Sequence, residues 1–260
     1  RRINIFFILN SIKFFYSIYR DRINFFHIIM TTNQKKIFCI EGNIGAGKST
    51  LLSLLEKNIP NCLVLQEPVA EWKNVGGRDL LSAFYEDPLR WCFTFELYSM
   101  FTIMKRLQDA MRGDKDIILM ERSLFSNRVF HHISYALDKL DTLEMTILKN
   151  FFDYFKRSYP KLNGIIFVDT DVEECLQRIT HRGREEENKI NYFYLKKLEE
   201  GFKTAKYGCK MMMINGKYDL KNPQKMLEDV KKFIRTPEDV YVTFNSNQFK
   251  GRWWASRAPR

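Results

Sequence analysis

The chain has 260 residues, of which 45% are hydrophobic and 28% charged, enough to bury one sizeable core. Much of its formal charge of +11 lies in the terminal segments. The positive charge that remains in the middle of the chain suits a site that binds phosphates as well as a groove that binds a polyanion. Its five cysteines are odd in number and widely spaced, so the sequence indicates neither a paired disulfide framework nor a CxxC metal site and predicts reduced thiols.

Residues 1–29 are rich in arginine and contain a single acid, Asp21. This composition fits a mitochondrial transit peptide, but the polar stretch that begins at Met30 favours a start there, with non-native sequence before it. Lys13 and Arg20 interrupt the apolar runs, so no transmembrane helix is expected. We therefore expect a domain over 30–235, an unassigned tail over 236–260 and a cytoplasmic protein, or a mitochondrial one if the transit peptide is genuine.

Short apolar runs alternate with longer helical patterns along the domain. The runs predict strands over 36–40, 62–65, 117–120, 164–168 and 210–214. The longer patterns predict helices over 48–57, 88–112, 124–137, 142–159, 172–180, 192–205 and 223–234, with Asp87 and Asp171 as N-caps. This alternation indicates an α/β fold with a five-stranded parallel sheet, helices on both faces and a ligand at the carboxyl edge of the strands.

The segment G-N-I-G-A-G-K-S-T follows the first predicted strand and opens the first helix, which is the context a phosphate-binding loop requires. Its residues, all predicted to bind the phosphate donor, are Gly42, Asn43, Ile44, Gly45, Ala46, Gly47, Lys48, Ser49 and Thr50. Backbone N–H groups would wrap phosphate oxygens, Lys48 would reach the outer phosphates, and Ser49 would ligate Mg²⁺. ATP or a similar triphosphate is the expected donor, whereas the loop leaves the acceptor open.

Three further segments carry charged side chains at the same predicted sheet edge. Glu67 ends the second strand and could take a proton from an attacking hydroxyl, although a solvated loop acid is the commoner role for such a residue. Glu121 and Arg122 end the third strand and could hold a metal ion and a phosphate, or form a surface ion pair. The run R-I-T-H-R-G-R-E-E-E suits either a lid that closes on a phosphoryl group or a solvated charge cluster.

With these pieces in chain order, the sequence resembles the deoxynucleoside kinases, the group of deoxycytidine, deoxyguanosine, mitochondrial thymidine and insect multisubstrate kinases. The resemblance covers roughly residues 35–234 and rests on five segments. These are G-N-I-G-A-G-K-S-T, E-P-V-A-E-W, F-Y-E-D-P-L-R-W-C-F-T-F, M-E-R-S-L-F-S-N-R and R-G-R-E-E-E. It implies a P-loop kinase fold with an arginine-bearing lid, an ATP and Mg²⁺ requirement, a small deoxynucleoside substrate and a homodimer. Nucleic-acid and membrane partners are not expected.

The resemblance also implies a role for each matching position. Glu67 would be the base for the sugar 5′-hydroxyl with Arg122 beside it, and Ser49 and Glu121 would bind magnesium. Arg182 and Arg184 would form the lid, with Arg178 at the donor nucleotide. The implied substrate-binding residues are Trp72, Tyr85, Phe95, Glu96, Asn127, His131 and Glu187. Tyr85 and Glu187 would hold the 3′-hydroxyl, and the bulk of Tyr85 would disfavour ribose.

Two of these positions depart from the family pattern. Glu96 replaces a glutamine that pairs with the base edge, and His131 replaces a second stacking aromatic residue. An ionised Glu96 offers only acceptors, which predicts deoxyguanosine as the first choice and thymidine as the second. Two alternatives stay open, because burial could keep Glu96 protonated and glutamine-like, or its helix could turn it away from the base.

The same residues distinguish this function from three others. A thymidylate-type monophosphate kinase shares the loop and lid, but its acceptor is already anionic and needs no base such as Glu67. A non-catalytic scaffold of the same fold is disfavoured because Lys48, Ser49, Glu67, Glu121 and Arg122 are all present. A nucleic-acid-binding ATPase would need a basic stripe with stacking aromatic residues, and the sequence shows none outside its terminal segments.

Overall fold

A computed structural model of the chain describes residues 35–218 and 220–236. The predicted N-terminal extension over 1–29 and most of the tail over 236–260 lie outside the described residues. Lys36 begins the unit that holds all of the elements below. Within the described ranges, no helix is both long and apolar enough to cross a membrane.

A five-stranded parallel sheet forms the centre of the described unit, in the strand order β2-β3-β1-β4-β5. Its strands are β1 (Lys36–Gly42), β2 (Cys62–Leu65), β3 (Ile117–Glu121), β4 (Gly164–Asp169) and β5 (Met211–Asn215). The register pairs Ile40 of β1 with Glu121 of β3, and Gly42 of β1 with Val168 of β4. The carboxyl ends of β1, β3 and β4 therefore meet at one edge, as the strand pattern predicts.

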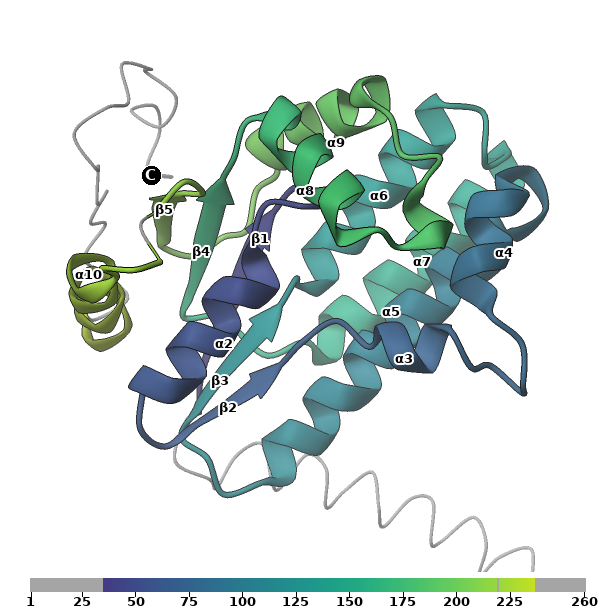
Figure 1. The fold of residues 1–260 in the computed structure, drawn as a ribbon. Coiled ribbons are helices and arrows are strands. Elements are labelled where there is room, and N and C mark those ends of the chain that lie inside the picture. The colour runs from purple at the N-terminus through teal and green to yellow at the C-terminus, as the bar shows by residue number, and fades with distance from the viewer. Residues whose placement is uncertain (1–34, 219, 237–260) are drawn as a thin grey trace, which may run out of the picture. The chain divides into compact units, whose positions relative to one another are not determined.

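Helices connect the strands and cover the sheet (Figure 1). They are α2 (Lys48–Asn58), α3 (Val69–Trp72), α4 (Leu80–Glu86), α5 (Pro88–Arg112), α6 (Leu124–Ala136), α7 (Thr142–Ser158), α8 (Val172–Arg182), α9 (Tyr192–Thr204) and α10 (Gln224–Arg235), with a 3-10 turn η1 (Glu185–Glu187). Figure 1 shows α2 in front of β1 and β3, α10 beside β5, and α5, α6 and α7 grouped on the other side of the unit. Parallel strands need such crossovers, which explains the alternation of the sequence.

Two apolar clusters hold these layers together. The larger one surrounds the sheet and includes Phe38 of β1, whose ring meets Phe233 of α10 at a centroid distance of 5.8 Å. The smaller one lies among α4, α5, α6 and α7 and includes Met100 and Phe152. The second cluster fixes α5 and α6 against each other, and both helices contribute side chains to the cavity described below.

The predicted strands and longer helices are confirmed, with ends that shift by one or two residues. Asp87 caps α5 as predicted, since its carboxylate accepts from the Arg90 backbone N–H at 3.2 Å. Asp171 precedes α8 but its side chain makes no capping bond; its Oδ2 accepts from Lys217 Nζ at 2.9 Å. The short helices α3 and α4 were not predicted, because four and seven residues give too little apolar periodicity to recognise.

Candidate active site

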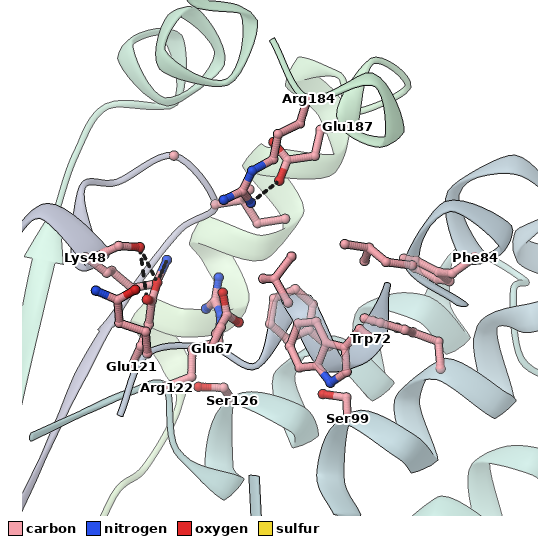
Figure 2. A pocket seen from close by; sticks show the side chains of 18 of the residues that line it. Lys48, Glu67, Trp72, Phe84, Ser99, Glu121, Arg122, Ser126, Arg184 and Glu187 are labelled. Carbon is pink, nitrogen blue, oxygen red and sulfur yellow. Dashed lines mark hydrogen bonds and ion pairs between the residues drawn. The ribbon is translucent and has the colours of Figure 1, made fainter. Parts of the chain in front are cut away.

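A cavity of about 580 Å³ opens at the carboxyl edge of the sheet, a size typical of small-molecule sites. Figure 2 shows that it has two halves. Lys48, Glu121, Arg122 and Glu67 form a charged half, whereas the rings of Trp72 and Phe84 mark an aromatic half.

The phosphate loop joins β1 to α2 in a conformation that glycine alone tolerates. Gly42 has φ +140°, and a Cβ placed there would lie 2.5 Å from the Val168 carbonyl oxygen of β4. Gly45 has φ +76°, and its Cβ would lie 2.5 Å from the Cys175 carbonyl oxygen of α8. The backbone can thus turn sharply and present the N-terminus of α2, where N–H groups favour anions.

Side chains of the loop fix its position. The Asn43 amide donates to the Leu195 carbonyl of α9 at 2.8 Å, and Lys48 Nζ donates to the Asn43 carbonyl at 2.8 Å. Lys48 is only 4% exposed and lies 3.7 Å from a Glu121 oxygen. Burial and the charge of Arg122 lower the pKa of Lys48, while Glu121 opposes that shift. A phosphate would give this buried ammonium group a further anionic partner besides Glu121.

Ser49 and Glu121 form the part of the charged half that fits Mg²⁺. The Ser49 hydroxyl donates to both carboxylate oxygens of Glu121, at 2.9 and 3.1 Å. Among the described residues no cluster of three or more His, Cys, Asp or Glu side chains could hold a metal ion alone. Mg²⁺ commonly takes one or two protein oxygens and completes its shell with phosphate and water, so this donor set fits it.

Glu67 and Arg122 form a short ion pair at the centre of the cavity. Arg122 Nε donates to Glu67 Oε1 at 2.6 Å, and its NH1 group donates to the Gly42 carbonyl at 3.0 Å. Burial alone would raise the pKa of Glu67, but the charges of Arg122 and Lys48 outweigh it and hold the pKa below its usual value. Glu67, at 22% exposed, is therefore an ionised carboxylate in contact with the cavity, as a proton acceptor must be.

Arg122 also lies near an aromatic ring and near Glu41, an acid to which the sequence motifs assign no role. The Arg122 backbone has φ +63°, and its guanidinium lies over the ring of Phe130 at 4.8 Å. Behind it, the fully buried Glu41 of β1 accepts the hydroxyls of Ser123 and Ser126, both at 2.6 Å. Burial raises the pKa of Glu41, although Arg122 and both hydroxyl bonds counteract that shift. The only signal for Glu41 in the sequence is an acid within an otherwise apolar strand.

The arginine-rich run forms the roof of the cavity. Arg182 and Arg184 both donate to Glu187, at 2.5 and 3.2 Å (Figure 2 shows Arg184 and Glu187). Gly183 at the end of α8 has φ +65°, which turns the chain between the two arginines. The charge of Arg184 also helps to lower the pKa of Glu67. These residues are therefore close enough to act on one ligand.

Arg178, predicted at the donor nucleotide, has a different set of contacts. Its guanidinium donates to the Ala46 carbonyl of the phosphate loop at 3.1 Å, to the Gly216 carbonyl at 2.9 Å and to Glu174 at 2.9 Å. It also borders the cavity. Its observed contacts hold the phosphate loop to the segment after β5.

The aromatic half is built from three rings that pack on one another. Phe95 stacks on Phe84 at a centroid distance of 4.7 Å and meets Trp72 edge to face at 5.3 Å. The Trp72 indole N–H donates to the Thr102 hydroxyl at 2.9 Å, which fixes the ring. Burial raises the pKa of the neighbouring Tyr85, as do Glu187 and Glu67. Tyr85 thus lies within electrostatic reach of both carboxylates.

The structure brings most of the predicted residues to one cavity wall. Gly42, Asn43, Ala46 and His131 are the predicted residues that do not form part of that wall. The wall also contains residues to which the sequence analysis assigned no role, among them Phe84, which begins the segment F-Y-E-D-P-L-R-W-C-F-T-F, Phe130 and Tyr194. They come from helix faces that only the packing of α4, α6 and α9 turns toward the cavity.

These features define a P-loop kinase: a parallel sheet, a phosphate loop with its lysine, and an acidic and an arginine side chain at the neighbouring strand end. Residues 38–238 match the sequence profile of the Deoxynucleoside kinase family. The chain belongs to the deoxynucleoside kinase family. It is accordingly an enzyme of nucleotide salvage that phosphorylates nucleosides from a nucleotide donor.

Similar proteins support this assignment. A probable deoxycytidine kinase of fowlpox virus is 37% identical over 169 residues, covering 64% of this chain and 69% of the viral one. Deoxycytidine kinase of Bos taurus is 36% identical over 191 residues, covering 64% and 73% of the two chains. Mitochondrial thymidine kinase 2 of Homo sapiens is 35% identical over 164 residues, covering 62% and 61%.

Proposed function

We propose that the enzyme transfers the γ-phosphoryl group of ATP to the 5′-hydroxyl of a deoxyribonucleoside. The observation that carries this proposal is the ionised Glu67 carboxylate, which faces the same cavity as the phosphate loop and the aromatic half. A hydroxyl acceptor must lose a proton during transfer, and Glu67 would receive it. The aromatic rings offer a flat apolar slot of the kind a nucleobase fills.

In this reaction the 5′-oxygen forms a bond to the γ-phosphorus while the bond from that phosphorus to the bridging oxygen of ATP breaks. The hydroxyl proton passes to Glu67, and ADP leaves with the electron pair of the broken bond. Arg122 keeps Glu67 oriented through the 2.6 Å hydrogen bond and adds positive charge near the transferred group. Lys48 neutralises charge on the outer phosphates.

Mg²⁺, held by Ser49 and Glu121 together with phosphate oxygens, would neutralise charge on the donor phosphates. Arg182 and Arg184 would leave Glu187 in part and close on the transferred phosphoryl group as a lid. Glu187 and Tyr85 would then bind the 3′-hydroxyl of the sugar. The bulk of Tyr85 beside that hydroxyl disfavours a 2′-hydroxyl, which is why deoxyribose is proposed.

The test is an assay with γ-³²P-labelled ATP, the full chain and the four deoxynucleosides, their ribonucleoside counterparts and their 5′-monophosphates. We expect labelled deoxynucleoside monophosphates, with much less label on ribonucleosides and none on monophosphates. Transfer to monophosphates alone would replace the proposal with a monophosphate kinase. If the native chain transferred label to none of these acceptors, and Lys48→Ala bound ATP as well as the native chain, the protein would be a scaffold.

We also propose a homodimer. Large apolar side chains remain exposed on α5 and α7, among them Leu89, Phe101, Leu143 and Tyr154. Covering such side chains is a common reason for association between copies. Light scattering on the purified chain measures the mass directly, and a monomer at micromolar concentration would refute this proposal.

A further inference from the structure

The base end of the cavity contains an acid and a histidine in contact. Glu96 of α5 is 3% exposed and lines the cavity, while His131 of α6 lies behind it and is 1% exposed. His131 Nε2 is 3.4 Å from Glu96 Oε2. Among the described residues Nε2 has no hydrogen-bond partner of its own, and the Glu96 carboxyl group is close enough to become one.

The protonation states of both groups follow from burial. Burial raises the pKa of Glu96 to about 8, and it lowers the pKa of His131 to about 3. At neutral pH the pair thus consists of a protonated carboxyl and a neutral imidazole. A neutral imidazole has one acceptor nitrogen, and a proton on Oε2 is close enough to be donated to it after a small rotation.

The other groups around Glu96 leave this arrangement in place. The Ser134 hydroxyl of α6 donates to Oε1 at 3.5 Å, and its effect on the carboxyl is weaker than that of burial. Lys139, after α6, and Arg122, after β3, favour the ionised form but are also outweighed by burial. The remaining titratable neighbours are Cys92 on α5 and Tyr194 on α9, and burial together with Glu96 raises the pKa of both. Both are therefore neutral near pH 7.

A second acceptor faces the same end of the cavity. Asn127 is 3% exposed and lines the cavity beside Ser99, to whose hydroxyl its amide nitrogen donates at 3.0 Å. Its Oδ1 is another buried polar atom without a partner in the described part of the chain. With the Glu96 proton directed to His131, Oε1 of Glu96 and Oδ1 of Asn127 are two acceptors that a base in this cavity could meet.

We propose that the protonated Glu96 carboxyl donates its hydrogen bond to His131, so that Glu96 meets a base only as an acceptor and the pocket selects guanine among the bases. This inference rests on the proposed deoxynucleoside kinase reaction and names its substrate. Guanine is the base whose pairing edge carries two adjacent donors, a ring N–H and an amino group. Cytosine and adenine would set a ring nitrogen against an oxygen, and a buried mismatch of that kind costs about tenfold or more in affinity.

The carboxyl group alone would allow a second arrangement. A protonated glutamic acid that pointed its O–H at the base would imitate glutamine and accept cytosine or adenine. The imidazole removes that option by accepting the hydrogen bond on the side away from the base. His131 is therefore a positioning residue: it changes which atoms of Glu96 meet the substrate and touches no substrate itself.

The experiment compares kcat/KM for the four deoxynucleosides at pH 6.5 and 8.5 in four chains: native, His131→Phe, Glu96→Gln and His132→Phe. His132→Phe is the matched control, because it makes the same change one residue along, at an exposed position. The native chain and the control should prefer deoxyguanosine over deoxycytidine by about tenfold or more at both pH values. Glu96→Gln should prefer deoxycytidine or deoxyadenosine with no pH dependence.

His131→Phe gives the decisive result. Without the imidazole, the Glu96 proton can face the base, so deoxycytidine should gain about tenfold at pH 6.5 relative to deoxyguanosine. That gain should shrink by at least about threefold at pH 8.5, where the carboxyl group loses its proton. Equal base ratios in His131→Phe and native chain, within about twofold at both pH values, would overturn the proposal, as would a native preference for deoxycytidine.

A second measurement covers the case in which His131→Phe does not fold. In the native chain, the NMR resonances of one histidine ring should shift with pH near 8, because the neighbouring carboxyl titrates there, and this shift should vanish in Glu96→Gln. If no histidine shows this shift, the hydrogen bond between Glu96 and His131 is refuted. If the native chain phosphorylates no deoxynucleoside, the proposed kinase reaction is refuted, whereas the NMR measurement still tests the hydrogen bond between Glu96 and His131.

Discussion

Replacing Glu67 by glutamine isolates the role of its negative charge. The glutamine carbonyl can still accept the Arg122 Nε hydrogen bond, which is 2.6 Å long in the native chain, so the side chain should keep its place. What disappears is the ability to take a proton from the 5′-hydroxyl. General-base contributions are typically 10²–10⁴-fold, so kcat should fall by at least about 100-fold, which corresponds to about 2.7 kcal/mol.

The assay is steady-state turnover with labelled ATP and the best deoxynucleoside, together with ATP binding by calorimetry. ATP affinity should change by less than about threefold, because Lys48 and the phosphate loop are untouched. Glu71→Gln is the control, since that nearby carboxylate is 40% exposed and faces Arg106 at 3.8 Å. Its turnover should stay within about twofold of the native value.

A fall of less than about fivefold in Glu67→Gln would refute Glu67 as the base. If Glu71→Gln then showed the large loss, the base would be Glu71. A fall accompanied by a lower melting temperature would instead point to the ion pair with Arg122 as a structural element. Melting curves of both variants therefore belong to the experiment.

Three other substitutions test the charged half. Lys48→Ala should abolish both ATP binding and phosphoryl transfer, since it removes the buried ammonium group at the phosphate loop, and retained activity in the labelled assay would contradict the loop's role. Glu41→Ala should lower the free energy of unfolding by about 3 kcal/mol, measured by urea denaturation, because two buried hydroxyls lose their 2.6 Å partner; a loss below about 1 kcal/mol would count against it. Gly45→Ala should prevent tight ATP binding, because its Cβ would lie 2.5 Å from a backbone oxygen, and native affinity in calorimetry would show that the loop adjusts freely.

The local sequence determined the parts of this protein that depend on short-range pattern. The phosphate loop, the strands around it and the long helices were predicted because their signals lie within one element: glycine spacing, apolar runs and helical periodicity. The resemblance to the deoxynucleoside kinases rested on the same segments, and the family match over residues 38–238 confirms it. The short helices α3 and α4 escaped prediction because they are too brief to show a period.

The pairing of polar side chains was decided by the tertiary structure. Glu41 meets Ser126, 85 residues along the chain, because β1 and β3 are neighbours in the sheet and α6 starts where β3 ends. In the same way, the packing of α5 on α6 places His131 behind Glu96, where the sequence had suggested only a missing aromatic ring. Sequence names the groups that can carry a proton, but their protonation depends on burial and on neighbours that only the fold brings within a few ångströms.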